Sequence, residues 1–129
     1  MNAACALGMD SFILTSINIF PELTLDLLAA GRNGDMLRAK NIQEKLSSAV
    51  LVITKHGKYC FSHLARCIVT KNLLFAGNWV QTMKTAMSLL TGINVGLPRA
   101  PLKSISSDAL TTMITDLANL GYQPKLKHN

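Results

Sequence analysis

A single run of strand-forming residues, FILTSINIF at positions 12–20, most constrains what this chain can fold into. Apolar residues occupy both parities of the run, a pattern typical of a strand buried on both faces of a parallel sheet. Such a strand needs neighbouring strands to pair with, and no further stretch supplies them. We therefore expect the chain to be part of a larger protein.

The rest of the sequence predicts helices. Pro21 can begin the first of them and Gly31 can end it, so the strand and this helix form half of a βα unit. Further on, Asp35 is a predicted N-cap, and apolar residues recur at spacings of three and four. The predicted helices span 21–30, 36–53, 80–90 and 107–120, the last opening at Ser106 or Ser107 and closing at Gly121.

The composition is unusually apolar for a small domain. Hydrophobic residues make up 49% of the chain and charged residues 16%, against about 25% charged residues in an ordinary soluble domain. No stretch reaches the roughly 18 apolar residues of a spanning helix, so we expect no membrane partner. The net charge of +6 is scattered rather than gathered in a basic stripe, so we expect no nucleic-acid partner. Three cysteines without a secretory signal favour a reducing, cytoplasmic location.

Three segments together resemble a known family. They are GMDSFILTSINIFPE, LLAAGRNGDMLRAKNIQEKL and NWVQTMKTAMSLLTGINVGLPRAPL, and they cover almost the whole chain except residues 58–77. Their order and spacing resemble the carboxyl-terminal part of the N-acetylneuraminate lyase and dihydrodipicolinate synthase family of class I aldolases. Within that family the sequence looks most similar to the N-acetylneuraminate lyase branch.

The resemblance implies a fold that is mainly α in this chain: the last βα unit plus the C-terminal helical extension of a (β/α)₈ barrel aldolase. Residues 11–17 would be the eighth strand, so residues 1–31 would be the remnant of the barrel. Residues 32–129 would be the helical extension, interrupted by a non-family insertion at 58–77. Since a complete barrel takes about 250 residues, we expect this chain to be truncated.

The resemblance also implies an activity for the intact parent enzyme. It would cleave N-acetylneuraminate, a sialic acid, to N-acetylmannosamine and pyruvate through a lysine Schiff base, without a cofactor or metal, as a homotetramer. The Schiff-base lysine and the proton-relay tyrosine of the family lie on earlier strands and are absent here. We therefore expect no catalytic residue in this chain, and no activity from it alone.

Two residues match the family's substrate pocket. Thr15 and Ser16 correspond to a hydroxyl-bearing pair at the end of the eighth strand, and barrel sites form at the C-terminal ends of strands. The resemblance thus implies that they bind substrate in an intact barrel; otherwise they are small strand residues bonded to backbone. Arg99 is expected to be a structural clamp between helices.

Other interpretations stay open. The second choice within the same fold is a fragment of another 2-oxo-acid aldolase, of the 4-hydroxy-2-oxoglutarate aldolase or dihydrodipicolinate synthase type. A different class is a non-catalytic helical interaction module that associates with itself, as a homo-oligomer, or with a full-length parent. A small zinc-binding or nucleic-acid-binding protein is a third possibility.

The insertion at 58–77 and the residues before it hold a potential set of zinc ligands. His56, Cys60, His63 and Cys67 would share one face of a helix. Four such ligands extend over about 16 Å of a straight helix and cannot surround a single ion. We therefore expect no metal site there.

The genetic code suggests another origin for the same stretch. Codons for Gly57, Lys58 and Tyr59 can contain a splice-donor sequence, and codons for 73–77 can end in an acceptor of matching phase. Our hypothesis is that residues 58–77 are a translated intron. Genomic DNA without GT and AG at these two positions would refute it.

Overall fold

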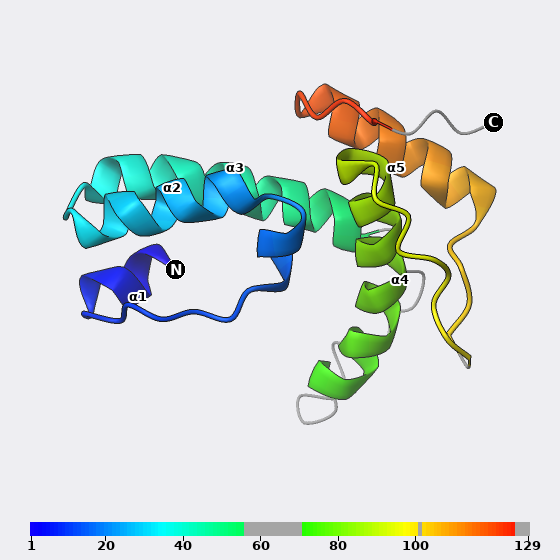
Figure 1. Cartoon of the computed structure of the whole chain (residues 1–129), viewed down its shortest axis with the longest axis horizontal. Coiled ribbons are helices and arrows are strands. Elements are labelled where there is room, and N and C mark those ends of the chain that lie inside the picture. Colours follow the sequence, from blue (N-terminus) through cyan, green and yellow to red (C-terminus); the bar gives the residue numbers. More distant parts are fainter. Residues whose placement is uncertain (56–70, 101, 126–129) are drawn as a thin grey trace. The chain divides into compact units, whose positions relative to one another are not determined.

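The computed structural model describes residues 1–55, 71–100 and 102–125, and for residues 71–78 it describes the backbone alone. This part of the chain is mainly helical and contains no strand, which confirms the mainly α prediction. Figure 1 shows the helices. In chain order the elements are α1 (Asn2–Ala6), the 3₁₀ helix η1 (Thr15–Asn18), α2 (Pro21–Arg32), α3 (Met36–Lys55), α4 (Lys71–Thr91) and α5 (Ser107–Asn119).

The chain divides into two compact units, Met1–Val50 and Leu51–Asn129. The first unit contains α1, η1, α2 and most of α3. The second contains the last turn of α3, α4, α5 and the segments that follow these two helices. Each unit has its own buried side chains.

The strand predicted over residues 11–17 is wrong for this chain. Residues 9–14 have no regular secondary structure, and Thr15 begins a 3₁₀ helix instead. The physical reason is that a strand forms its backbone hydrogen bonds with a neighbour, and no other described segment pairs with this one. Burial also differs from the prediction, because Ile13 is fully exposed rather than buried on either face.

The predicted helices that follow are confirmed as α2 and α3. Pro21 occupies the first turn of α2, where its missing N–H costs no hydrogen bond. The two helices are joined by a tight turn in which Gly34 has a φ of 75°, a conformation that favours glycine. Asp35 caps α3 as predicted, since its Oδ1 accepts a hydrogen bond from the Arg38 N–H at 3.0 Å. An exposed ion pair of 4.0 Å joins Arg38 to Asp26 across this antiparallel hairpin.

Small residues let the elements of the first unit approach closely. The buried side chains of the unit include several alanines, and α1 packs against α2 at Gly31. A Cβ atom at Gly31 would lie 2.7 Å from Cys5 Cβ and 2.8 Å from Cys5 Sγ. The amino group of Met1 also donates to Gln43 Oε1 at 3.0 Å. The core of this unit is formed by Ile19, Phe20, Leu27, Ala30, Ala39, Leu46 and Ala49.

In the second unit the helix predicted over 107–120 is confirmed as α5, whereas the one predicted over 80–90 is only the C-terminal part of α4, which begins at Lys71. Ser106 caps α5, since its hydroxyl accepts a hydrogen bond from the Ala109 N–H at 3.3 Å. After Gly121, which has a φ of 88°, the chain returns to α4, and the Lys125 N–H donates to the Leu89 carbonyl at 2.7 Å. The core of this unit is formed by Ile53, Thr82, Met83, Ala86, Leu89, Met113 and Leu117.

The predicted insertion at 58–77 falls partly within α4. This helix begins at Lys71, so residues 71–77 continue the helical backbone of the residues that follow them. Residues 58–70 lie outside the described part of the chain, as do His56, Cys60, His63 and Cys67. The translated-intron origin of residues 58–77 stays a hypothesis.

We predict that Gly31→Ala detaches α1 from α2. Alanine favours a helix by about 1 kcal/mol over glycine, but the added methyl group overlaps Cys5, and such overpacking costs about 1–3 kcal/mol. In a background with Cys60→Ser and Cys67→Ser, the Gly31→Ala variant should therefore raise the rate at which a thiol reagent modifies Cys5.

The matched control for this prediction is Gly34→Ala. It strains the backbone at a positive φ but meets no atom within 4 Å, so it should lower the free energy of unfolding without raising the modification rate. Equal rates in Gly31→Ala and the unsubstituted background would contradict the close approach of α1 and α2.

Candidate functional site

The structure places the two predicted site residues on η1, immediately before α2. Thr15 is exposed and Ser16 is buried, with 8% of its surface accessible. The Ser16 carbonyl accepts hydrogen bonds from the N–H groups of Ile19 at 3.1 Å and Phe20 at 2.9 Å, which fixes the turn. The two hydroxyl-bearing residues are therefore adjacent in the chain but lie in different environments.

Both hydroxyl groups lack a hydrogen-bond partner among the residues that the structure describes. By contrast, Thr24 in the neighbouring α2 turn donates from Oγ1 to the Phe20 carbonyl at 2.9 Å. A serine or threonine hydroxyl can donate one hydrogen bond and accept two. Thr15 and Ser16 can thus bind a ligand by hydrogen bonds. Nucleophilic chemistry would need an adjacent base, and neither hydroxyl is bonded to one in the described chain.

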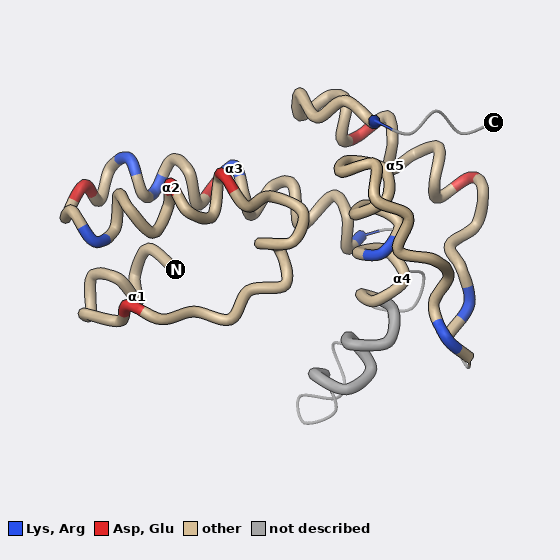
Figure 2. Tube along the Cα trace, in the orientation of Figure 1, with Lys and Arg blue, Asp and Glu red and all other residues tan. Residues whose placement is uncertain are grey.

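The lysine side chains that the structure describes are exposed or, at Lys84, half-buried. Lys40 lies 3.8 Å from Glu44 on the surface of α3, and Lys84 Nζ donates to the Leu97 carbonyl at 2.8 Å. A Schiff-base lysine is instead held in a buried, apolar site. Figure 2 shows that acidic and basic residues are interspersed along α2 and α3.

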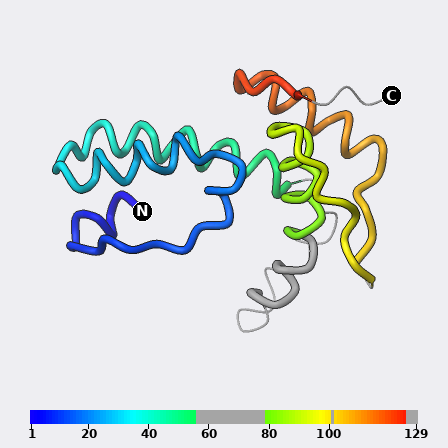
Figure 3. Tube along the Cα trace, in the orientation of Figure 1, coloured from blue at the N-terminus to red at the C-terminus, as the bar shows by residue number. Residues whose placement is uncertain are grey.

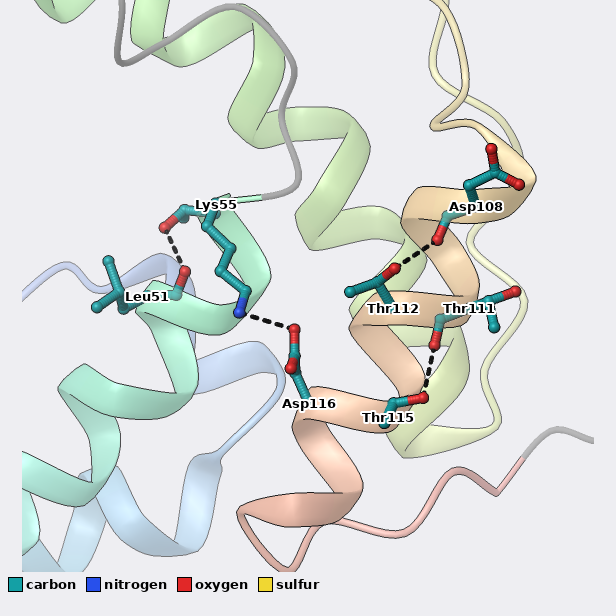
Figure 4. A network of polar contacts seen from close by, with 8 residues as sticks. Leu51, Lys55, Asp108, Thr111, Thr112, Thr115 and Asp116 are labelled. Carbon is teal, nitrogen blue, oxygen red and sulfur yellow. Dashed lines mark hydrogen bonds and ion pairs between the residues drawn. The ribbon is translucent and has the colours of Figure 1, made fainter.

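The clearest polar contact of the second unit joins the end of α3 to α5. Lys55 Nζ lies 2.7 Å from Asp116 Oδ2, and the two side chains are 44% and 24% exposed. Figure 4 shows this ion pair beside threonine hydroxyls that donate to carbonyls of their own helices, such as Thr112 to Asp108 at 2.8 Å. These hydroxyl groups are already hydrogen-bonded, so the arrangement stabilises packing and offers no reactive group.

The connection between α4 and α5 contains the PRAPL sequence on which the family resemblance partly depends. Asn94 Oδ1 accepts from the Gly96 N–H at 2.9 Å, and the positive φ of Gly96, 69°, turns the chain. Arg99 is exposed and forms no ion pair or hydrogen bond through its side chain within the described residues. The predicted clamp between helices is therefore not found.

Other potential reactive groups are sparse. The described residues contain no group of three or more histidine, cysteine, aspartate or glutamate side chains that could hold a metal ion. Tyr122 is partly buried, and this burial raises the pKa of its phenol above the ordinary value of 10.0, so the hydroxyl is protonated at neutral pH. The family resemblance implies a ligand-binding role for Thr15 and Ser16, which stays a prediction, and no described residue is hydrogen-bonded to their hydroxyls.

Comparisons with known proteins leave the family unassigned. No protein-family model, curated protein or solved structure matches the chain. In the described residues, none of the helices combines the length and the apolar character needed to cross a membrane.

We predict a measurable coupling between Lys55 and Asp116. A double-mutant cycle with Lys55→Met and Asp116→Asn should give a coupling energy of about 0.5–1 kcal/mol, which declines when salt is raised to about 1 M. The measurement is the free energy of unfolding in urea for the four variants.

Lys40 and Glu44 provide the control pair for this cycle. Their separation is 3.8 Å and both side chains are 65% exposed, so their coupling should be no more than about 0.5 kcal/mol. Equal coupling energies in the two pairs would contradict the prediction that the shorter, less exposed ion pair stabilises the fold more.

Proposed function

We propose that this chain is the carboxyl-terminal part of an N-acetylneuraminate lyase-like aldolase and is catalytically inactive alone. The parent enzyme would release pyruvate from N-acetylneuraminate in the cytoplasm. The support from the sequence is the ordered set of three family-like segments. The support from the structure is the exposed, unpaired segment before α2, at the position where the resemblance requires a barrel strand.

The unpaired segment is the structural observation that most supports the proposal, because a missing set of barrel strands would account for two features together. Ile13 has a fractional exposure of 105% and Ile17 of 38%, although both belong to a run of residues that favours burial. The helix that follows, α2, is nevertheless formed and packed. A neighbouring strand on each side would cover these side chains and pair the backbone, as in a parallel barrel.

The chemistry of the described residues supports the proposed inactivity. Aldol cleavage through a Schiff base needs an amine in a buried site and a group that transfers a proton. The lysine side chains that the structure describes either contact carboxylates or carbonyls or are exposed, on helices and in the segments that follow α4 and α5. In an intact barrel, Thr15 and Ser16 would contribute hydrogen bonds to the substrate rather than bond-breaking chemistry.

Sequencing the transcript together with the genomic DNA upstream of Met1 tests this proposal. We expect upstream exons that encode the seven preceding βα units, including the Schiff-base lysine, and reads that skip residues 58–77. Transcripts that begin at Met1 and have no upstream βα coding sequence would overturn the aldolase proposal. Upstream exons together with genomic DNA that lacks GT and AG at the two predicted splice positions would refute the intron hypothesis alone.

In that parent enzyme, we predict that Ser16→Ala raises the KM for N-acetylneuraminate about three- to tenfold, because one hydrogen bond to the substrate is lost. Trapping of pyruvate by borohydride reduction should remain, since the Schiff-base lysine is untouched. The control is Thr112→Ala, which removes a hydroxyl bonded within α5.

A Ser16→Ala variant with an unchanged KM would remove Ser16 from the substrate pocket. As a negative control, the present chain alone should trap no pyruvate under the same conditions. A covalent pyruvate adduct on this chain would contradict its proposed inactivity.

A further inference from the structure

The turn that joins α2 to α3 contains an asparagine followed by a glycine. Figures 1 and 3 show this turn at the end of the hairpin that the two helices form. Asn33 is the C-cap of α2, and Gly34 follows it with a φ of 75°. Both residues are exposed, and no hydrogen bond joins the Asn33 side chain to a described residue. The side-chain amide is therefore accessible to attack.

Glycine hinders such an attack less than any other residue. The backbone nitrogen of the residue after an asparagine can attack the side-chain carbonyl carbon and close a five-membered succinimide ring. A Cβ atom on that residue would crowd the approach and restrict the backbone rotation that the approach needs. Gly34 has no Cβ atom, and nothing lies within 4 Å of the place where one would be. The pair Asn33–Gly34 is thus open to ring closure.

The folded turn holds the attacking nitrogen away from its target. The Gly34 N–H donates to the Gly31 carbonyl at 3.2 Å. The Asp35 N–H donates to the Ala30 carbonyl at 3.0 Å, and the two bonds together form a Schellman motif. Asn33 has a ψ of 0°, which places the Gly34 nitrogen beside the Asn33 backbone nitrogen rather than beside its Cβ atom. The ring can close only after the turn opens.

We infer that Asn33 is a site of spontaneous deamidation and that opening of the α2–α3 turn sets its rate. In the opened turn the Gly34 nitrogen loses its proton and bonds to Asn33 Cγ, while the Cγ–Nδ2 bond breaks and ammonia leaves. Water then adds to either carbonyl of the succinimide and breaks one of its two C–N bonds. The products are aspartate at position 33, or isoaspartate, in which the main chain runs through the side-chain carbon.

Either product weakens the turn in which it forms. A carboxylate at position 33 lies at the C-terminus of α2, where the helix dipole disfavours negative charge. Isoaspartate adds one carbon atom to the main chain, which displaces the two hydrogen bonds of the Schellman motif. The reaction runs in one direction, so the fraction of chains with a loosened hairpin increases with the age of the protein.

A second exposed asparagine lacks these features. Asn94 lies in the irregular segment after α4, but its Oδ1 accepts a hydrogen bond from the Gly96 N–H at 2.9 Å. Val95 follows it, and a β-branched side chain hinders attack by its own nitrogen. The Val95 N–H also donates to Ser88 Oγ at 3.4 Å. Asn94 therefore serves as an internal control.

Peptide mass spectrometry of the purified full chain, aged at neutral pH, tests the site. Trypsin cleaves after Arg32 and Arg38, and the peptide 33–38 contains Asn33 as its single asparagine. We expect this peptide to gain the mass of an amide converted to a carboxylate, part of it as isoaspartate that an isoaspartyl methyltransferase labels. Asn94 should stay unconverted. Asn33→Gln should abolish the conversion, because the longer side chain would have to close a six-membered ring.

Two variants at Asp35 test the control by the turn. Asp35→Ala removes the cap of α3 and should raise the rate of deamidation about fivefold, which corresponds to the loss of one cap. Asp35→Ser keeps a capping oxygen and should leave the rate unchanged. Hydrogen exchange of the Gly34 N–H should rise in step with the deamidation rate, because both need the same local opening.

Four outcomes would overturn the inference. They are an Asn33 that stays unconverted as the chain ages, conversion of Asn94 at the same rate, an Asp35→Ala rate equal to that of the unsubstituted chain, and a slower rate in both Asp35 variants. The last would give the Asp35 carboxylate a direct part in the reaction in place of the turn. The inference does not depend on the aldolase proposal, because it involves only the α2–α3 turn.

Discussion

A backbone N–H or carbonyl group that is removed from water needs a hydrogen-bond partner in the protein, and the source of that partner decides which elements form. A helix provides partners from within its own segment, whereas a strand depends on a second segment. The helices α2, α3 and α5 therefore form with their predicted bounds close to those observed. The segment before α2 has the side-chain alternation of a strand but no backbone to pair with, so it stays extended and unpaired.

Local sequence signals identified the ends of the helices because each signal acts through a short-range contact. Asp35 and Ser106 were predicted to cap α3 and α5, and each accepts a backbone hydrogen bond within three residues of itself. Pro21 opens α2, and Gly121 follows α5 with a positive φ. These contacts need no knowledge of the rest of the fold.

Long-range contacts were not predictable in the same way. Each of these contacts depends on how helices that are distant in the chain pack, and no local sequence pattern indicates that packing. The contacts join Cys5 to Gly31, Met1 to Gln43 and Lys55 to Asp116. Arg99 was expected to link helices and is exposed instead. Thr15 and Ser16 lie on a 3₁₀ turn rather than on the predicted strand, and there Ser16 is buried whereas Thr15 is exposed.

The extended segment around Ile13 shows why the helices of this chain can form without the predicted strand. In an intact barrel, the strand would be flanked on both sides by other strands, and its N–H and carbonyl groups would all be paired within one chain. In the structure, no described residue accepts a hydrogen bond from the N–H groups of residues 10–14. Water can satisfy these exposed groups, so the segment stays extended, whereas a strand cannot form without its neighbours. The helices need no such neighbours, because their hydrogen bonds lie within each helix.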